Sequence, residues 1–148
     1  MAEADCIVSS RTNWNQPDAL FLRPKNLVIG IGCNRGTERE LIEAAVVSTL
    51  ESSHLSLLSL HSLASIDLKA DEEGLLAYAR LHGLAILFFP SEALNRVEGI
   101  TRSAAVFQAT GAHGVAEPAA LLAARRGRLI VPKIKYRDVT IAIVEKYL

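Results

Sequence analysis

A glycine-rich turn separates an apolar run from a helix-like segment in the stretch Gly30-Ile31-Gly32-Cys33-Asn34-Arg35-Gly36-Thr37-Glu38. The apolar residues 27–29 before it predict a short buried strand, and glycines directly after a strand let the backbone approach a bound group without a clash at Cβ. Thr37 and Glu40 have the spacing of a capping box, which predicts a helix from about residue 38 to residue 52. Backbone N–H groups at such a helix start favour a phosphate or carboxylate, so this turn is the first candidate ligand site.

The glycine spacing matches a dinucleotide-binding fingerprint only in part. The order is G-x-G-x-x-x-G, with Arg35 where G-x-G-x-x-G has its third glycine. The fingerprint also needs an acidic residue about 20 positions further on, and residues 52–54 at that distance are Ser-Ser-His. A nucleotide- or anion-binding module therefore stays an alternative, as does a tight turn without any ligand.

Length and composition predict one soluble domain. The chain has 148 residues, 50% of them hydrophobic and 22% charged, which suffices for a core of its own. Its 16 basic and 16 acidic residues cancel, so we expect no nucleic-acid partner. The two cysteines, Cys6 and Cys33, lie in unlike contexts and predict neither a disulfide framework nor a zinc site. Without a signal peptide or an apolar run of about 20 residues, the sequence predicts a cytoplasmic protein with no membrane partner.

The order of strand and helix signals predicts the fold. Residues 1–26 are polar and irregular and are interpreted as a leader or linker, followed by one domain at residues 27–148. Strand signals at 27–29, 55–66, 84–89, 129–131 and 139–144 alternate with helix signals at 38–52, 72–82, 91–94, 102–110 and from about 116. The last two strands are joined by a polar turn and must pair antiparallel. We therefore expect an α/β fold: a three-layer α/β/α sandwich around a mixed, mostly parallel sheet of about five strands that ends in an antiparallel hairpin.

Three groups of loop residues carry polar side chains without an evident structural role, at 33–35, at 67–73, and at 101–103 together with 112–117. Ligands of open α/β sheets bind beyond the carboxyl ends of the strands, so the loops after residues 31, 66 and 89 are expected to converge on one crevice. Asp67, Lys69 and Glu72 are then candidates for an acid, a cation and a base. A surface charge pair is the alternative for Lys69 and Glu72.

Other single residues also have both an ordinary and a functional interpretation. A helix N-terminus and Arg35 would lower the pKa of the Cys33 thiol, but no histidine base accompanies it, so a packed cysteine is favoured. Glu117 lies at a helix start, where the dipole stabilises a carboxylate whatever its function. Lys133 interrupts an apolar strand, so its side chain is either exposed or directed at a negative group. The four histidines lack ligand spacing, and no metal site is expected.

Together these segments resemble the C-terminal domain of CbiG and its stand-alone relative CobE in cobalamin biosynthesis. The resemblance extends over residues 23–145. Its most specific parts are the glycine loop and the segment Asp67-Leu68-Lys69-Ala70-Asp71-Glu72, and further matches lie at 91–94, 114–117, 133 and 139–142. Glu73 and Gly74 depart from the family pattern at the start of a helix.

The resemblance implies a domain of cobalt-precorrin-5A hydrolase, which opens the ring A lactone of the corrin precursor and releases acetaldehyde. The implied partners are the cobalt-precorrin, a tetrapyrrole-derived macrocycle, and upstream CbiG domains or other pathway enzymes; no cofactor is expected. The catalytic candidates are Lys69, Glu72 and Glu117: a carboxylate positions water while Lys69 or the glycine-loop backbone stabilises the oxyanion. Ligand-binding candidates are Gly30, Gly32, Cys33, Asn34, Arg35, Gly36, Asp67, Ser103 and Lys133.

A non-catalytic, CobE-like carrier or interaction domain is the alternative. Six basic residues and no acidic residue lie between Glu117 and Asp138, and this local basic surface suits the binding of a corrinoid rich in carboxylates.

Overall fold

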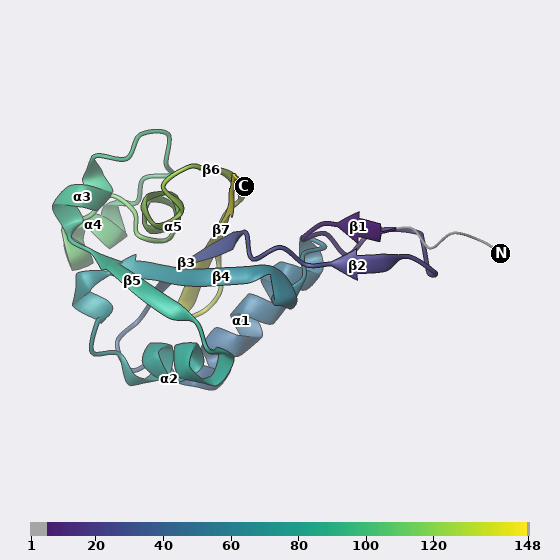
Figure 1. The fold of residues 1–148 in the computed structure, drawn as a ribbon. Coiled ribbons are helices and arrows are strands. Elements are labelled where there is room, and N and C mark those ends of the chain that lie inside the picture. Colours follow the sequence, from purple (N-terminus) through teal and green to yellow (C-terminus); the bar gives the residue numbers. More distant parts are fainter. Residues whose placement is uncertain (1–5, 148) are drawn as a thin grey trace.

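A five-stranded sheet forms the centre of the molecule in the computed structural model, which describes residues 6–147 (Figure 1). The strands lie in the order β5-β4-β3-β7-β6. Their bounds are β3 (Leu27–Cys33), β4 (Leu60–Ile66), β5 (Ala85–Phe89), β6 (Gly127–Lys135) and β7 (Val139–Lys146). β3, β4 and β5 pair in parallel, whereas β7 pairs antiparallel with both β3 and β6. β7 therefore runs opposite to the other four strands, and the predicted mixed sheet with an antiparallel final hairpin is confirmed.

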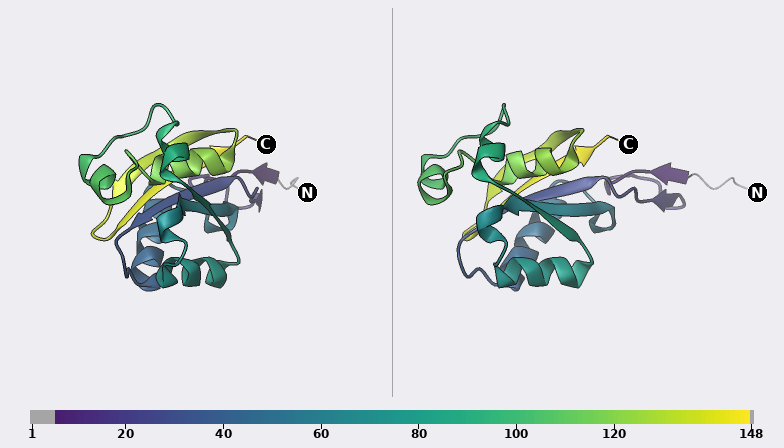
Figure 2. Two further views of the ribbon diagram at one scale, coloured as in Figure 1. Left: turned by 90° about the vertical axis from the view of Figure 1, so that its left-hand side faces the viewer. Right: turned by 60° about the vertical axis from the view of Figure 1, so that its left-hand side comes forward.

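Helices cover both faces of the sheet and complete the predicted three layers (Figures 1 and 2). One face carries α1 (Arg39–Ser52) and α2 (Glu73–His82), and the other carries α3 (Ser91–Asn95), α4 (Ala104–Thr110) and α5 (Ala116–Ala124). Short 3₁₀ helices, η1 (Leu57–Ser59) and η2 (Asp67–Lys69), precede and follow β4.

The central strand β3 is buried on both faces. Leu27, Ile29 and Ile31 belong to the core beneath α1 and α2, whereas Val28 belongs to the core beneath α5. Successive side chains of a strand point to opposite faces, so a strand covered on both sides reads as a continuous apolar run. This burial explains the apolar run that precedes the glycine turn.

Gly30 allows α5 to approach β3 closely. A Cβ added at Gly30 would lie 1.7 Å from the backbone oxygen of Ala116, the first residue of α5. Gly32 lies two residues further along the same strand, and a Cβ there would make ordinary contacts at 3.8 Å and 3.9 Å. The packing of α5 against β3 thus requires glycine at position 30 but not at position 32.

The predicted capping box at α1 is wrong. The helix begins at Arg39 after Glu38, and no side chain caps its first turn. The hydroxyl of Thr37 instead donates a 2.7 Å hydrogen bond to the Asn34 carbonyl, and Gly36 has a positive φ of 80°. The hydroxyl is used within the turn at residues 34–37 and is therefore not available to the helix.

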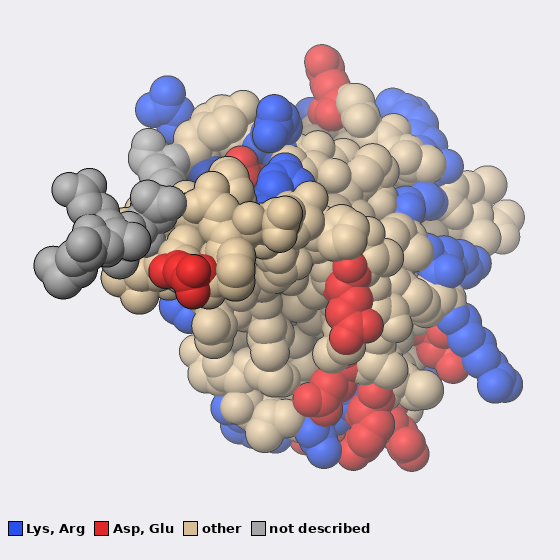
Figure 3. Space-filling view, turned by 90° about the vertical axis from the view of Figure 1, so that its right-hand side faces the viewer, with Lys and Arg blue, Asp and Glu red and all other residues tan. Residues whose placement is uncertain are grey.

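The segment before β3 is more regular than predicted. β1 (Cys6–Val8) and β2 (Leu20–Leu22) form a two-stranded parallel sheet that projects as an arm from the domain (Figures 1 and 2). The guanidinium of Arg23 donates to the carbonyl of Ser9 at 2.9 Å and so links the segments that follow the two parallel strands. Figure 3 shows this end of the molecule, where acidic and basic side chains both occur. The division into a leader and a domain at residue 27 stays a prediction.

Replacement of Gly30 by alanine is expected to destabilise the domain by about 3 kcal/mol, because the new Cβ meets backbone that no rotamer change can move. Gly32→Ala is the matched control on the same strand and should change the free energy of unfolding by about 1 kcal/mol at most. Urea unfolding of both variants measures the difference. Equal midpoints would contradict the close approach of α5.

Candidate functional site

A cavity of about 620 Å³ lies beyond the carboxyl ends of β3 and β4. The loops after these strands form one part of its lining, as the sequence predicted. The segment directly after β5 does not line the cavity, and residues 101 and 103 reach it instead. The remaining lining comes from α4, the start of α5 and the hairpin between β6 and β7.

Most of the predicted site residues meet in this cavity. It is lined by Gly32, Cys33, Asn34, Arg35, Lys69, Ser103, Glu117 and Lys133. The other four candidates lie outside the lining: Gly30 beneath α5, Gly36 in the turn before α1, Asp67 at the start of η2 and Glu72 before α2. The hydroxyl of Ser103 accepts a hydrogen bond from the Val106 N–H and so caps α4.

Glu117 connects three segments around the cavity. It lies in the first turn of α5 and is only 2% exposed. Its Oε1 accepts a 2.7 Å hydrogen bond from the Thr101 N–H, and its Oε2 accepts one of 2.9 Å from the Lys133 N–H. The Thr101 hydroxyl donates a further bond of 3.3 Å to Oε2. The buried carboxylate thereby fixes the loop at residue 101 and strand β6 against α5.

Glu72 holds the glycine turn from outside the cavity. It is 3% exposed, and its Oε2 accepts a hydrogen bond from the Gly36 N–H at 3.1 Å. Its Oε1 lies 2.8 Å from a guanidinium nitrogen of Arg35 but has no partner in hydrogen-bond geometry, so this contact is an ion pair. Glu72 thus pairs with Arg35, in contrast to the alternative of a surface pair with Lys69.

Arg35 links the glycine turn to the segment after β4. Its guanidinium donates to the Asp71 carboxylate at 2.7 Å and to the Leu68 carbonyl at 3.0 Å. The hydrogen bond and the charge of Arg35 hold the pKa of Asp71 below its ordinary value. The Arg35 side chain is nevertheless 62% exposed, so it remains accessible at the edge of the cavity.

The environment of Cys33 does not favour thiolate chemistry. The residue ends β3 opposite Val139 of β7, and burial raises the pKa of its thiol. The charges of Lys69 and Arg35 lower that pKa, but burial, the largest influence, and the charge of Glu72 raise it, and the pKa lies above its ordinary value. Arg35 thus has the expected effect on the thiol pKa, but the net pKa is raised because Cys33 belongs to the strand and is partly buried. This environment agrees with the packed cysteine that the sequence favours.

Basic side chains dominate the charged part of the cavity lining. The basic residues are Arg35, Lys69, Lys133, Lys135 and Arg137, and the acidic ones are Glu117 and Asp138. Both acids are engaged: Glu117 with backbone N–H groups, and Asp138 with the side-chain amide of Asn34 at 3.0 Å. The cavity therefore offers a net positive charge to an anionic ligand.

Sequence reasoning did not assign Lys135, Arg137 or the α4 residues to the site. Lys135 and Arg137 were visible as part of a basic cluster, but their position depends on the pairing of β7 with β3. This pairing places the hairpin beside the glycine turn, where the Asn34 N–H donates to the Asp138 carbonyl at 3.0 Å. No local sequence signal specifies which strand neighbours β3.

Between residues 6 and 147 no helix has the length and apolar character needed to cross a membrane. Within the same residues, no group of three or more His, Cys, Asp and Glu side chains is arranged to hold a metal ion.

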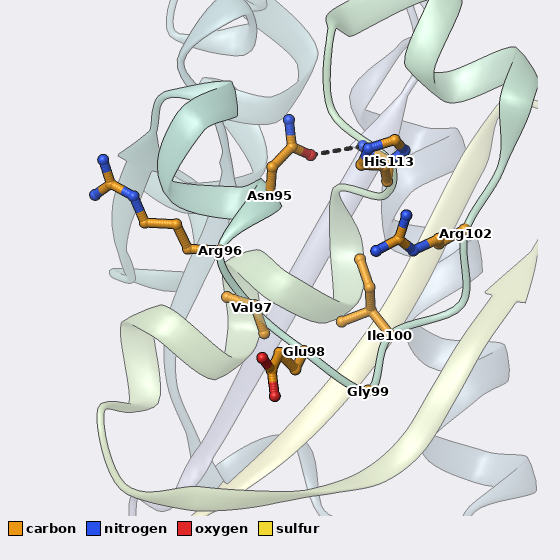
Figure 4. Close-up of a pocket in the computed structure, with 8 residues that line it drawn as sticks. All are labelled: Asn95, Arg96, Val97, Glu98, Gly99, Ile100, Arg102 and His113. Atoms are coloured by element: carbon orange, nitrogen blue, oxygen red, sulfur yellow. Dashed lines mark hydrogen bonds between the residues drawn. The ribbon is translucent and has the colours of Figure 1, made fainter.

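A second hollow of about 540 Å³ is lined by the end of α3, the segment at residues 96–102 and His113 (Figure 4). Figure 4 shows the hydrogen bond of 2.9 Å from the His113 N–H to the Asn95 side-chain oxygen, which joins two of its sides. Arg96 points away from the other residues drawn there. None of the predicted site residues lines this hollow, so the cavity at the strand ends is the candidate site.

The fold and the cavity define a three-layer α/β domain with a basic crevice at the strand ends of its central sheet. The chain belongs to the cobalamin synthesis G C-terminus family, whose model matches residues 27–144. This membership, which the sequence resemblance predicted, assigns the chain to cobalamin biosynthesis.

Two relatives and one solved structure support the assignment. The chain is 40% identical over 126 residues to the cobalt-precorrin-5A hydrolase of Priestia megaterium, covering 85% of this chain and 34% of that protein. It is 36% identical over 120 residues to protein CobE of a Sinorhizobium species, covering 79% and 78% of the two chains. The crystal structure of a CobE protein of the cobalamin (vitamin B12) pathway superposes with a TM-score of 0.76 at 34% identity, covering 82% of this chain and 91% of that one. The chain spans between 34% and 44% of the length of the hydrolases that it matches.

Replacement of Glu72 by alanine is expected to lower the free energy of unfolding by about 1–3 kcal/mol, because the Gly36 N–H and Arg35 lose the buried carboxylate as a partner. Glu73→Ala is the control, since this neighbouring glutamate is exposed and should cost about 0.5 kcal/mol at most. Urea unfolding compares the two variants. A larger loss for Glu73→Ala would contradict the role assigned to Glu72.

The pKa of Asp71 is expected to rise toward its ordinary value when Arg35 is replaced by alanine. Because the folded-state pKa lies below the unfolded one, the pair stabilises the fold above the unfolded pKa, and this contribution disappears as the pH falls through the folded value. An NMR titration of the Asp71 carboxyl carbon measures the shift. Arg39→Ala, which removes pairs with Glu40 and Glu43 instead, should leave the Asp71 titration unchanged.

Proposed function

We propose that this domain binds cobalt-precorrin-5A for the hydrolase reaction of cobalamin biosynthesis. The observation that carries the proposal is the basic cavity at the strand ends. Among the described residues, Lys69, Lys133 and Lys135 line it without forming an ion pair. A corrin precursor carries many acetate and propionate arms, and these are the groups that such cations bind.

The cations come from separate elements and surround the ligand space. Arg35 follows β3 and Lys69 follows β4, while Lys133 and Lys135 lie two residues apart on β6. Both lysines line the cavity, so they lie on the same side of the hairpin. This distribution suits a ligand with several carboxylates around its edge better than a ligand with one anionic group.

Lactone opening needs a group that positions water and a group that stabilises the developing negative charge. In our proposal Lys69 provides the positive charge. Glu117 positions the water, because its Oε1 accepts a single hydrogen bond and so retains an acceptor site. Glu72 lies outside the cavity lining, and we propose that it acts by holding the glycine turn. The rest of a longer hydrolase is the proposed partner that completes the cleft.

A second candidate is a CobE-like carrier without catalytic activity. The observation in its favour is that both buried carboxylates, Glu72 and Glu117, are bound to backbone N–H groups of the fold. A domain of this kind would bind the corrinoid and leave it unchanged.

A titration of the chain with cobalt-precorrin-5A, followed by absorbance and with acetaldehyde assayed in the same tube, tests the proposal. Binding with acetaldehyde release supports a hydrolase that acts by itself. Binding without release supports a carrier, or a domain that needs the rest of the enzyme, and adding the upstream part of a hydrolase relative separates these two. Absence of binding would contradict both candidates.

Lys133→Ala is expected to weaken corrinoid binding about tenfold, the loss of one charge-assisted hydrogen bond. Arg128→Ala is the control, because this residue lies on the same strand but outside the cavity lining. The same titration measures both dissociation constants. An equal affinity of the two variants would exclude Lys133 from the site.

A further inference from the structure

Helix α4 forms an uncharged part of the cavity lining. Its sequence at residues 104–110 is Ala-Ala-Val-Phe-Gln-Ala-Thr, without any charged residue. Ala105, Val106 and Ala109 line the cavity. Ala105 and Ala109 are four residues apart and therefore lie one above the other on the same helix face. The cavity thus combines this apolar surface with the basic residues of the strand ends and the hairpin.

The apolar face of α4 is exposed although the helix is held in place. No residue of α4 is buried. At its start the Ser103 N–H donates to the His113 carbonyl at 2.8 Å, and at its end the Asn95 amide donates to the Gly111 carbonyl at 2.9 Å. Gly111 ends the helix with a positive φ of 78°. Of the apolar residues that face the cavity, Val106 also packs against the core beneath α5, whereas Ala105 and Ala109 are exposed. Burial in the core therefore does not account for these two alanines.

An apolar surface beside clustered cations fits a ligand with a hydrocarbon face and an anionic edge. We propose that Ala105, Val106 and Ala109 contact the face of the tetrapyrrole-derived ring, while its carboxylate arms reach the lysines of β6. This inference rests on the proposed function and adds the residues that distinguish a macrocycle from a simple polyanion. Leu68, which is exposed after β4, lines the same cavity and extends the apolar surface.

Two neighbouring alanines of α4 provide a matched test. Ala105 lines the cavity, whereas Ala104 is outside the lining, and both are exposed in the first turn of the helix. Asparagine at position 105 places a polar amide against the ring without changing the net charge. Asparagine at position 104 lowers the helix propensity of α4 by the same amount but leaves the cavity lining unchanged. Thermal unfolding should show the same midpoint for both variants.

Cobyrinic acid, a cobalt corrinoid with free carboxylic acid arms, is the probe for an absorbance titration of the full chain. Ala105→Asn is expected to weaken its binding about tenfold, and Ala104→Asn less than twofold. Equal affinities of both variants and the parent chain would overturn the ring contact, and would be the result if a protein partner covered α4 instead.

The same titration distinguishes failure of the α4 contact from failure of the proposed function. If Lys133→Ala weakens binding and Ala105→Asn does not, the contact with α4 fails while the proposed function stands. If the parent chain binds neither cobyrinic acid nor cobalt-precorrin-5A, the proposed function fails and the inference fails with it.

Discussion

The close contact between the start of α5 and β3 is the constraint on which the site depends. It requires a residue without a side chain at Gly30, since any Cβ would meet the Ala116 backbone. With α5 held against the sheet, the carboxylate of Glu117 reaches the backbone of both Thr101 and Lys133. One glycine in the central strand therefore determines where the loop at residue 101 and strand β6 meet beneath the ligand cavity.

The position of β7 gives this cavity its charge. If β7 lay at the edge of the sheet beside β5, the hairpin between β6 and β7 would lie far from the glycine turn after β3. Because β7 pairs with β3 along seven residue pairs, Asp138 at the hairpin tip bonds to Asn34 in the glycine turn, and the neighbouring lysines line the cavity. The result is a crevice with cations on several elements and an apolar helix beside them, which is the chemistry expected for a polycarboxylate macrocycle.

The arrangement of the two buried carboxylates bears on the role that we propose for this domain. Glu72 stabilises the turn that carries Arg35, and Glu117 connects α5 to its neighbours. Both acids therefore contribute to the shape of the site. The chain spans less than half the length of the hydrolases that it matches, so we propose only ligand binding and charge stabilisation for its own basic residues.

Local sequence determined the elements of this protein, and the tertiary structure decided how their side chains are used. The apolar run before Gly30, the alternation of strands and helices, and the crevice at the strand ends were all predictable, because periodicity and turn chemistry act over a few residues. The same reasoning assigned Thr37 to a helix cap, which was wrong because its hydroxyl is bonded within the turn. It also could not weigh the effect of Arg35 on the Cys33 thiol against burial beside β7, which raises the pKa and depends on the assembled fold. The pairing of Glu72 with Arg35 and the approach of Lys135 to the cavity likewise follow from strand order, which no local signal specifies.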